Sequence, residues 1–496
     1  MPKVLSFGKT IEKAKKFCFF LAFRSLIRTF VPMFSKKESE ALLERIRTGG
    51  QMTRKDKLNL IVQLSIPSIL AQLTSVVMFF IDQAMVGRIS VEAAAACGLV
   101  ESSTWLIGSL TNAASMGFSV QVAHFIGAND MERARHVFRH GLLCTLLFGF
   151  VVGATGLAIT PFLPYWLGGG ADIAGDASIY FGVFCCIIPF FQLSGLAGAM
   201  LKCSGDMRTP SIMSIVMCVM DVVFNFILIF VFHLGVLGVA LGTALAIVIG
   251  GAMQAYIALF RNKLLALFGR LNNDPQRSLR HYFEWGYVRN AVKISAPMAL
   301  QSVLMGGAQI VSTIIVAPLG NIAIAANTFA ITAESVCYMP GVGIGEAATT
   351  LIGQSIGAAR RDLCRSFARL TVGSGIAVMA LMGAVMFLTA PLLMALMTPV
   401  EEIIALGASV LRIEAFAEPM FAAAIVSYSI CVGAGDTLRP AIMNLCSMWG
   451  IRLTLAALLA PHYGLRGVWV AMAVELTFRG GIFLVRIFRE RWMKGT

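Results

Sequence analysis

Three polar side chains that could hold a cation or a proton stand inside otherwise apolar stretches of this sequence. Asp82 follows the run Met78-Phe79-Phe80-Ile81, and Asp221 and Asn225 are four residues apart in a second apolar stretch. Residues four apart lie on one face of a helix, so Asp221 and Asn225 are expected to point the same way. Carboxylate and amide oxygens are hard ligands that suit Na⁺, and neighbouring acids can also share a proton. Either ion fits these residues.

The elements that position these residues must be apolar helices. Hydrophobic residues make up 57% of the 496-residue chain, charged residues make up 13%, and the mean hydropathy is +0.79. Apolar stretches recur from Leu58 to Arg486, and about 20 such residues suffice for a helix to cross roughly 30 Å of hydrocarbon. The composition therefore predicts an all-α integral membrane protein. A carboxylate at this depth is costly, which makes each one a candidate functional residue.

Charges, prolines and glycines divide the apolar sequence into twelve predicted transmembrane helices. These fall near residues 58–87, 91–125, 134–162, 174–202, 209–232, 236–260, 287–317, 322–356, 362–396, 402–432, 439–460 and 465–487. The sequence contains no HExxH, Walker or paired-cysteine motif, and it leaves no polar domain for chemistry on a soluble substrate. We therefore expect neither enzymatic activity nor a cofactor.

The distribution of basic residues predicts how the chain is oriented across the membrane. The even-numbered connections and the tail 489–496 are rich in Lys and Arg, so both termini are predicted to be cytoplasmic, in a cell (inner or plasma) membrane. Residues 1–57 form a basic amphipathic segment with fourteen Lys or Arg and five acids. Within it, Phe17–Phe34 predicts an interfacial helix on anionic lipid, with a disordered tail as the alternative. Because the bases lie at helix ends, membrane lipids rather than nucleic acid are the expected partners.

The sequence also repeats itself after about 230 residues. Ser65-Ile66-Pro67 recurs as Ser295-Ala296-Pro297, and Ile126-Gly127-Ala128 recurs as Ile356-Gly357-Ala358. The motif Gly-Asp-x-x-x-Pro occurs at Gly205 and again at Gly435. Since each half holds six spans, the halves are parallel repeats, and they predict two lobes around a central cavity. The predicted lobes are residues 58–260 and 287–488, joined by a cytoplasmic linker at 261–286.

Several further residues are expected to act between or within these lobes. Pro67 and Pro297 are candidate hinges of the first helix in each lobe. Glu101 and Glu334 occupy similar places in the two halves, and they either face each other across the cavity and neutralise a cationic substrate or each anchor a hydrogen bond within a lobe. Internal ion pairs are predicted among six further charged residues of the second lobe, which are Arg412, Glu414, Glu418, Arg452, Glu475 and Arg479.

The segment Ile81–Arg88, the Gly-Ala turns after helices two and eight and the twin Gly-Asp motifs resemble the multidrug and toxic compound extrusion (MATE) family. The resemblance covers residues 58 to about 490. It implies a cation-coupled antiporter, driven by protons or sodium, that exports drugs and organic cations. It also implies that Asp82, Asp221, Asn225 and Thr243 form the coupling site. Similar transporters carry Asn and then Asp at the two helix-five positions, and the two residues are exchanged here.

Some members of this family carry acids in helices seven and ten, where this sequence has Met305 and Phe421. We expect those two side chains to line the substrate cavity instead. A lipid-linked oligosaccharide or lipid flippase of related design is the alternative function, and it would need a strongly cationic cavity, whereas the charges expected at mid-membrane are mainly acidic. We expect a monomer that binds small organic cations, while the sequence leaves open which compound it exports and which ion drives it.

Overall fold

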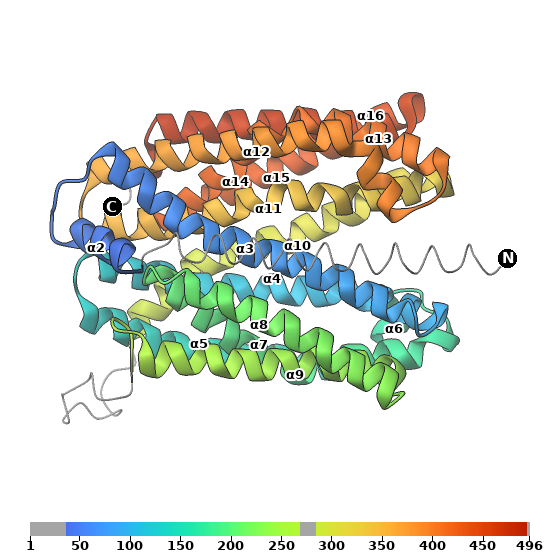
Figure 1. Ribbon diagram of the computed structural model, residues 1–496, viewed down its shortest axis with the longest axis horizontal. Coiled ribbons are helices and arrows are strands. Elements are labelled where there is room, and N and C mark those ends of the chain that lie inside the picture. The colour runs from blue at the N-terminus through green and yellow to red at the C-terminus, as the bar shows by residue number, and fades with distance from the viewer. Residues whose placement is uncertain (1–35, 268–283, 494–496) are drawn as a thin grey trace, which may run out of the picture.

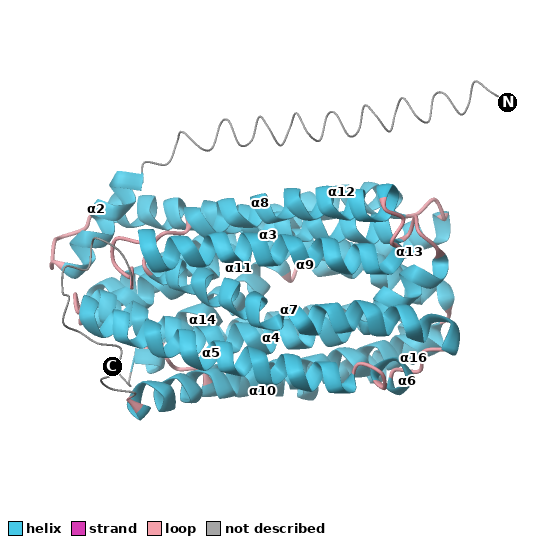
Figure 2. Cartoon of the chain, turned by 90° about the horizontal axis from the view of Figure 1, so that it is seen from below, coloured by secondary structure: helices cyan, strands magenta, loops and turns pink. Residues whose placement is uncertain are grey.

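Helices account for all the regular structure in the described parts of the chain, which in the computed structural model are residues 36–267 and 284–493. The long helices run along one axis, and most of the connections between them gather at the two ends of the molecule (Figures 1 and 2). Helix α2 and the C-terminus lie at the same end (Figure 1). The predicted interfacial helix at Phe17–Phe34 lies outside the described residues, as does most of the linker.

The first half of the chain supplies six long helical segments and two short helices. The long segments are α3 (Arg54–Val86), α4 (Val91–Gly127), α5 (Met131–Ile159), α7 (Ala171–Cys203), α8 (Arg208–Phe226) continued by η1 (Ile227–Val231), and α9 (Gly235–Tyr256) continued by η2 (Ile257–Arg261). The short helices are α2 (Lys36–Arg47) and α6 (Leu163–Trp166). Helix α3 begins four residues before the predicted Leu58 because Thr53 caps it through a capping box with Asp56.

The second half also supplies six long helical segments, although one of them is bent and two are joined without a separate loop. Its elements are α10 (Trp285–Val316), η3 (Ala317–Leu319), α11 (Asn321–Gly357), α12 (Arg361–Met397), α13 (Glu401–Ala415), α14 (Glu418–Gly433), α15 (Leu438–Ser447), η4 (Met448–Leu453), α16 (Thr454–Phe488) and η5 (Arg491–Met493). Helices α13 and α14 form one span bent by 59°. The run 438–488 would be about 75 Å long as one helix, but it breaks at Gly464, whose φ is +60°. It therefore makes two spans, and the predicted twelve-helix fold is confirmed.

Helices of the two halves gather on opposite sides of the molecule, and α3 and α10 lie near the boundary between them (Figure 1). The first part of α3 packs on the other lobe, where Leu60 and Leu64 share a buried cluster with Leu351 of α11 and Phe367 of α12. Lys57 Nζ donates a hydrogen bond across the same boundary to Ser366 Oγ at 3.0 Å. The end of α3 returns to its own lobe. The two lobes are thus held together most closely at the end where α3 begins.

A reciprocal pair of contacts at this end reflects the repeat. The His124 ring of α4 lies 2.9 Å from the Gly433 carbonyl of α14, and Gln354 of α11 donates to the Cys203 carbonyl of α7 at 2.8 Å. These two contacts are related by an offset of 230 residues. Gly127 and Gly357, related by the same offset, have no room for a side chain, because a Cβ on either would clash with the backbone of the opposite helix. The parallel repeat therefore closes one end of the molecule symmetrically.

The N-terminal segment also contributes to the buried core, because α2 packs against this closed end. Its side chains Leu42, Leu43 and Ile46 are buried in the same cluster as the start of α3. Arg47 Nη2 lies 3.5 Å from Gln354 Oε1, and burial lowers the pKa of the Arg47 guanidinium. The predicted C-terminal tail also contains packed residues, since Trp492 and Met493 of η5 belong to this cluster.

Candidate functional site

The structure brings Asp82, Asp221 and Asn225 together inside the first lobe. Asn225 Nδ2 donates to Asp82 Oδ1 at 3.1 Å and to Asp221 Oδ2 at 3.2 Å, so one amide links the two carboxyl groups. Asp221 and Asn225 of α8 are fully buried, whereas Asp82 of α3 is partly exposed. The four-residue spacing that suggested a common face therefore places both α8 side chains toward the end of α3.

Helix α9 completes this polar cluster. Thr243 lies beside the Asp221 carboxyl, and the preceding Gly242 lets α9 approach α8 closely, because a Cβ at Gly242 would overlap Asn225 Oδ1. Two oxygens of the cluster, Asp221 Oδ1 and Asn225 Oδ1, are buried and accept no hydrogen bond from the residues that the structure describes. Such oxygens suit a cation or an added proton, since a buried acceptor without a partner is unfavourable. The oxygen-only donor set fits Na⁺ and H⁺ equally.

A separate cavity of about 540 Å³ lies between the lobes. The first lobe lines it with Asn112 and Gln254, and the second lobe lines it with Met298, Phe421 and Tyr428. Three charged side chains also line it, namely Lys202, Glu346 and Arg479. The charged part of the cavity lining therefore consists of one acid and two bases.

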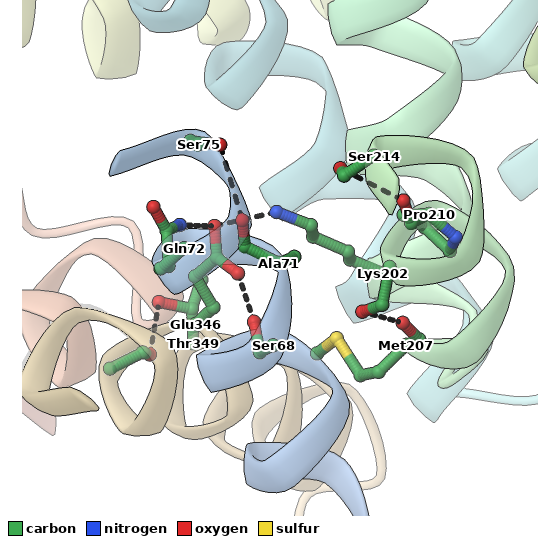
Figure 3. A network of polar contacts seen from close by, with 12 residues as sticks. Ser68, Ala71, Gln72, Ser75, Lys202, Met207, Pro210, Ser214, Glu346 and Thr349 are labelled. Atoms are coloured by element: carbon green, nitrogen blue, oxygen red, sulfur yellow. Dashed lines mark hydrogen bonds and ion pairs between the residues drawn. The ribbon is translucent and has the colours of Figure 1, made fainter. Parts of the chain in front are cut away.

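A network around Glu346 crosses the lobe boundary in this cavity (Figure 3). Lys202 Nζ of α7 forms an ion pair with Glu346 Oε1 of α11 at 2.5 Å. From α3, Gln72 Nε2 donates to Glu346 Oε1 at 3.1 Å and Ser68 Oγ donates to Glu346 Oε2. This site was not predicted from the sequence, because Lys202 is the last residue of the predicted span 174–202 and Glu346 was not among the candidate residues. A signal was available in Glu346, an acid deep inside the long apolar α11.

Of the four residues predicted to line the substrate cavity, Phe421 does so. Glu101 instead accepts hydrogen bonds within the first lobe, from Gln83 Nε2 at 3.4 Å and Trp105 Nε1 at 3.3 Å. Glu334 is buried inside the second lobe, and Met305 packs there against the cluster of Met448 and Leu453. Of the two alternatives for Glu101 and Glu334, the pair facing across the cavity is therefore wrong, because each points into its own lobe, and Glu101 instead anchors hydrogen bonds within its lobe.

Glu334 belongs to a buried charge cluster of the second lobe. Arg479 Nε pairs with Glu475 Oε1 at 3.2 Å, and Ser447 Oγ donates to the same oxygen at 2.6 Å. Glu414 and Glu418 flank the 59° bend between α13 and α14, and their carboxylate oxygens accept no hydrogen bond from the described residues. One predicted ion pair thus forms within this cluster. Arg412 lies outside it, with its guanidinium 5.7 Å from the centroid of the Phe387 ring.

The two candidate hinges lie inside continuous helices. Pro67 is in α3, and Pro297 is in α10. A proline in a helix interior removes one backbone hydrogen bond and so provides a point where the helix can bend. Pro67 directly precedes Ser68, which holds Glu346, so a bend there would move that contact. The hinge role stays a prediction.

A protein with two six-helix lobes, a cavity between them and a polar cluster buried in one lobe has the architecture of a multi-pass membrane transporter. The MatE family profile matches residues 67–227 and 297–458, one region in each lobe. The chain therefore belongs to the MatE family, as the resemblance of its motifs implied.

Individual relatives and solved structures agree with this assignment. The chain is 23% identical to "Probable multidrug resistance protein NorM" of Thermotoga maritima over 88% of this chain and 93% of the relative. It is 26% identical to "Multidrug resistance protein NorM" of Burkholderia vietnamiensis over 84% and 90%. Its fold is similar to that of the structure described as "Crystal structure of MATE in complex with MaL6", with a TM-score of 0.83, 20% identity and coverage of 92% and 99%.

Proposed function

We propose that this transporter is a cation-coupled antiporter that exports small cationic or amphipathic compounds by alternating access. The observation that carries this proposal is the separation of two sites. One is the cluster of Asp82, Asp221 and Asn225 inside the first lobe, and the other is the cavity lined by both lobes. A cation bound at the first site can then change the conformation that binds substrate at the second, as coupling between distinct sites requires.

Helix α3 connects the two sites physically. It carries Asp82 in its last turns and Ser68 and Gln72 at the cavity. Ten residues separate Gln72 from Asp82, which is about 15 Å along a helix. A cation that draws Asp82 toward Asp221 would therefore pull on the helix that also contacts the second lobe. For a nearly complete shift between two states, the cation must bind one of them about 10⁴-fold more tightly.

The lining of the cavity supports the proposed substrates. Met298, Phe421 and Tyr428 offer an apolar and aromatic surface, and Glu346 offers a carboxylate. Apolar and aromatic surfaces accept varied amphipathic molecules, and aromatic faces also attract organic cations. The relatives named as multidrug resistance proteins support the same substrate class.

The proposed orientation places the closed end of the molecule, with α2 and the C-terminus, at the cytoplasmic face of a cell membrane. The basic residues at that end support this, because cytoplasmic loops retain positive charge. Lys263 of the connection after α9 pairs there with Glu40 of α2 at 2.9 Å. The protein would act as a monomer, since each chain carries both lobes and the cavity between them.

A lipid-linked oligosaccharide or lipid flippase is the second candidate function. The observation that favours it is the pair of bases, Lys202 and Arg479, in the cavity lining. Each of them is paired with a carboxylate, Lys202 with Glu346 and Arg479 with Glu475. Those carboxylates would repel a pyrophosphate group, so we favour the antiporter. Flipping of a labelled lipid-linked pyrophosphate by the purified protein in liposomes, without efflux of organic cations, would reverse this preference.

The decisive test is Asp82→Asn in everted membrane vesicles, with proton and sodium gradients imposed separately. We expect the wild type to accumulate an organic cation under one of the two gradients. The variant should lose this uptake while its equilibrium binding of the same compound changes little, because the cavity is separate from the cluster. Asp172→Asn, an exposed acid at the start of α7, is the matched control. Full gradient-driven transport by Asp82→Asn would contradict the proposal.

A further inference from the structure

We infer that Glu346 is the carboxylate that binds the positive group of the substrate, and that Lys202 occupies this position when the cavity is empty. The inference deepens the proposed function, on which it rests. Lys202 would act as an internal competitor, so that a cationic substrate must displace it before it can pair with Glu346. Because the two residues belong to different lobes, the displacement also removes a contact between the lobes.

The position of Glu346 is the first argument. Among the described residues that line the cavity, Glu346 is the one acid. Its side chain is 24% exposed and that of Lys202 is 28% exposed, so a molecule in the cavity can reach both. The carboxylates of the second-lobe cluster differ in this respect, because Glu414, Glu418 and Glu475 are fully buried. A cation in the cavity therefore has one carboxylate with which it can pair.

The hydrogen bonds of Glu346 show that the carboxylate is prepared for a cation. Ser68 and Gln72, one turn apart on α3, both donate to it and fix its position. These neutral donors leave its negative charge uncompensated, and the ammonium group of Lys202 is the cation that compensates it. Removing one member of such a pair at low dielectric is costly unless another charge takes its place. A substrate cation can take that place, whereas a neutral molecule cannot.

The surroundings of Lys202 show that its side chain can move without unfolding its helix. Thr350 Oγ1 donates to the Lys202 carbonyl at 3.1 Å, and Gln354 Nε2 donates to the next carbonyl, that of Cys203, at 2.8 Å. Glu346, Thr350 and Gln354 are spaced by four residues and so form a stripe on one face of α11. Thr350 and Gln354 hold the backbone of α7, and only the contact of Glu346 depends on the side chain of Lys202.

Substrate binding would then weaken the contact between the lobes in steps. Displacement of Lys202 removes the contact nearest the cavity, and the two backbone contacts of Thr350 and Gln354 remain. The same α3 side chains that hold Glu346 lie on the helix that carries Asp82. Substrate at Glu346 and a cation at Asp82 can therefore act on one element, which is what exchange of the two requires.

The test compares the binding of a charged and an uncharged probe by the purified full-length protein in lipid nanodiscs. The charged probe is tetraphenylphosphonium, and the uncharged probe is triphenylphosphine oxide. Lys202→Met should bind the cation about tenfold more tightly than the wild type, since an ion-paired hydrogen bond no longer has to be broken. Glu346→Gln should bind it about tenfold more weakly. Neither variant should change the affinity for the uncharged probe.

Two further variants separate this inference from a purely structural ion pair. Lys57→Met removes one positive charge and one contact between α3 and α12 outside the cavity. The affinity of this variant for tetraphenylphosphonium should equal that of the wild type. Lys202→Arg keeps the competitor and should not tighten binding, and Glu346→Gln still tests the inference if Lys202→Met proves unstable. Unchanged or weaker binding of tetraphenylphosphonium by a folded Lys202→Met, or unchanged binding by a folded Glu346→Gln, would overturn the inference. Because these measurements need no gradient, failure of coupled transport in vesicles would be recognised separately.

Discussion

At the scale of single residues, the cluster at Asp82 depends on a close approach that only glycine permits. Gly242→Ala would push a methyl group into Asn225 Oδ1, so we expect the variant to lose about 1–3 kcal/mol of stability. It should also lose gradient-driven transport, because Asn225 holds both carboxyl groups. Thermal unfolding in detergent and vesicle uptake measure the two effects.

A matched glycine is available as the control for this substitution. Gly373 of α12 is exposed, and nothing lies within 4 Å of a Cβ placed there. Gly373→Ala should therefore be neutral or should stabilise the protein by about 0.5–1 kcal/mol. Equal unfolding temperatures for the two alanine variants would show that the contact between Gly242 and Asn225 does not matter.

Residue spacing predicted part of the site, and the limits have physical causes. The four-residue interval between Asp221 and Asn225 was sufficient to place them on one face. The apolar run before Asp82 identified that acid as a candidate, and the resemblance added Thr243 and joined all four into one site, which the structure brings together. The directions of the Glu101 and Glu334 side chains could not be predicted, because residues at similar positions in two repeats need not point at each other. The contact of Lys202 with the cavity could not be predicted either, because a long side chain at a helix end can extend either outward or back into the bundle.

At the scale of elements, α2 tests whether the N-terminal segment matters for the fold. Ile46 is fully buried against the closed end, so Ile46→Ala should cost about 2–5 kcal/mol of stability. The exposed Glu44 on the same helix is the control, and Glu44→Ala should change stability by less than about 0.5 kcal/mol. If the two variants had the same unfolding midpoint, α2 would contribute nothing to the stability of the fold.

Hydropathy predicted the helices well and their interruptions poorly. The ends of most spans differ from prediction by a few residues, because charges and helix caps mark them. The 59° bend before Glu418 was not foreseen, since both halves of that span are apolar and a sequence window averages over the break. The π-helical turns η1, η2 and η4 were missed for the same reason. The break at Gly464 was foreseen, because a glycine between two apolar runs can adopt the positive φ that a turn needs.

At the scale of the whole molecule, the reciprocal glycine contacts predict that the two halves contribute equally to closure. Gly127→Ala and Gly357→Ala each place a methyl group against the backbone of the opposite lobe, so either should open this end of the molecule. Cys203 is buried beneath the Gln354 contact and should then react several-fold faster with a maleimide, as measured by mass spectrometry of its peptide. The Gly373→Ala variant should react at the wild-type rate. If only one of the two substitutions exposed Cys203, the closure would not be symmetric.

The position of α3 has a consequence for how the protein is made. Its first turns pack on α11 and α12, which leave the ribosome almost 300 residues later. Until then Leu60 and Leu64 lack their native neighbours, and the first lobe cannot reach its final packing, although all six of its helices have been inserted. Biogenesis of this transporter therefore includes a waiting period in which a half-finished bundle must be protected in the bilayer. A chain that ends after the first lobe would remain in that state, as a target for membrane proteases.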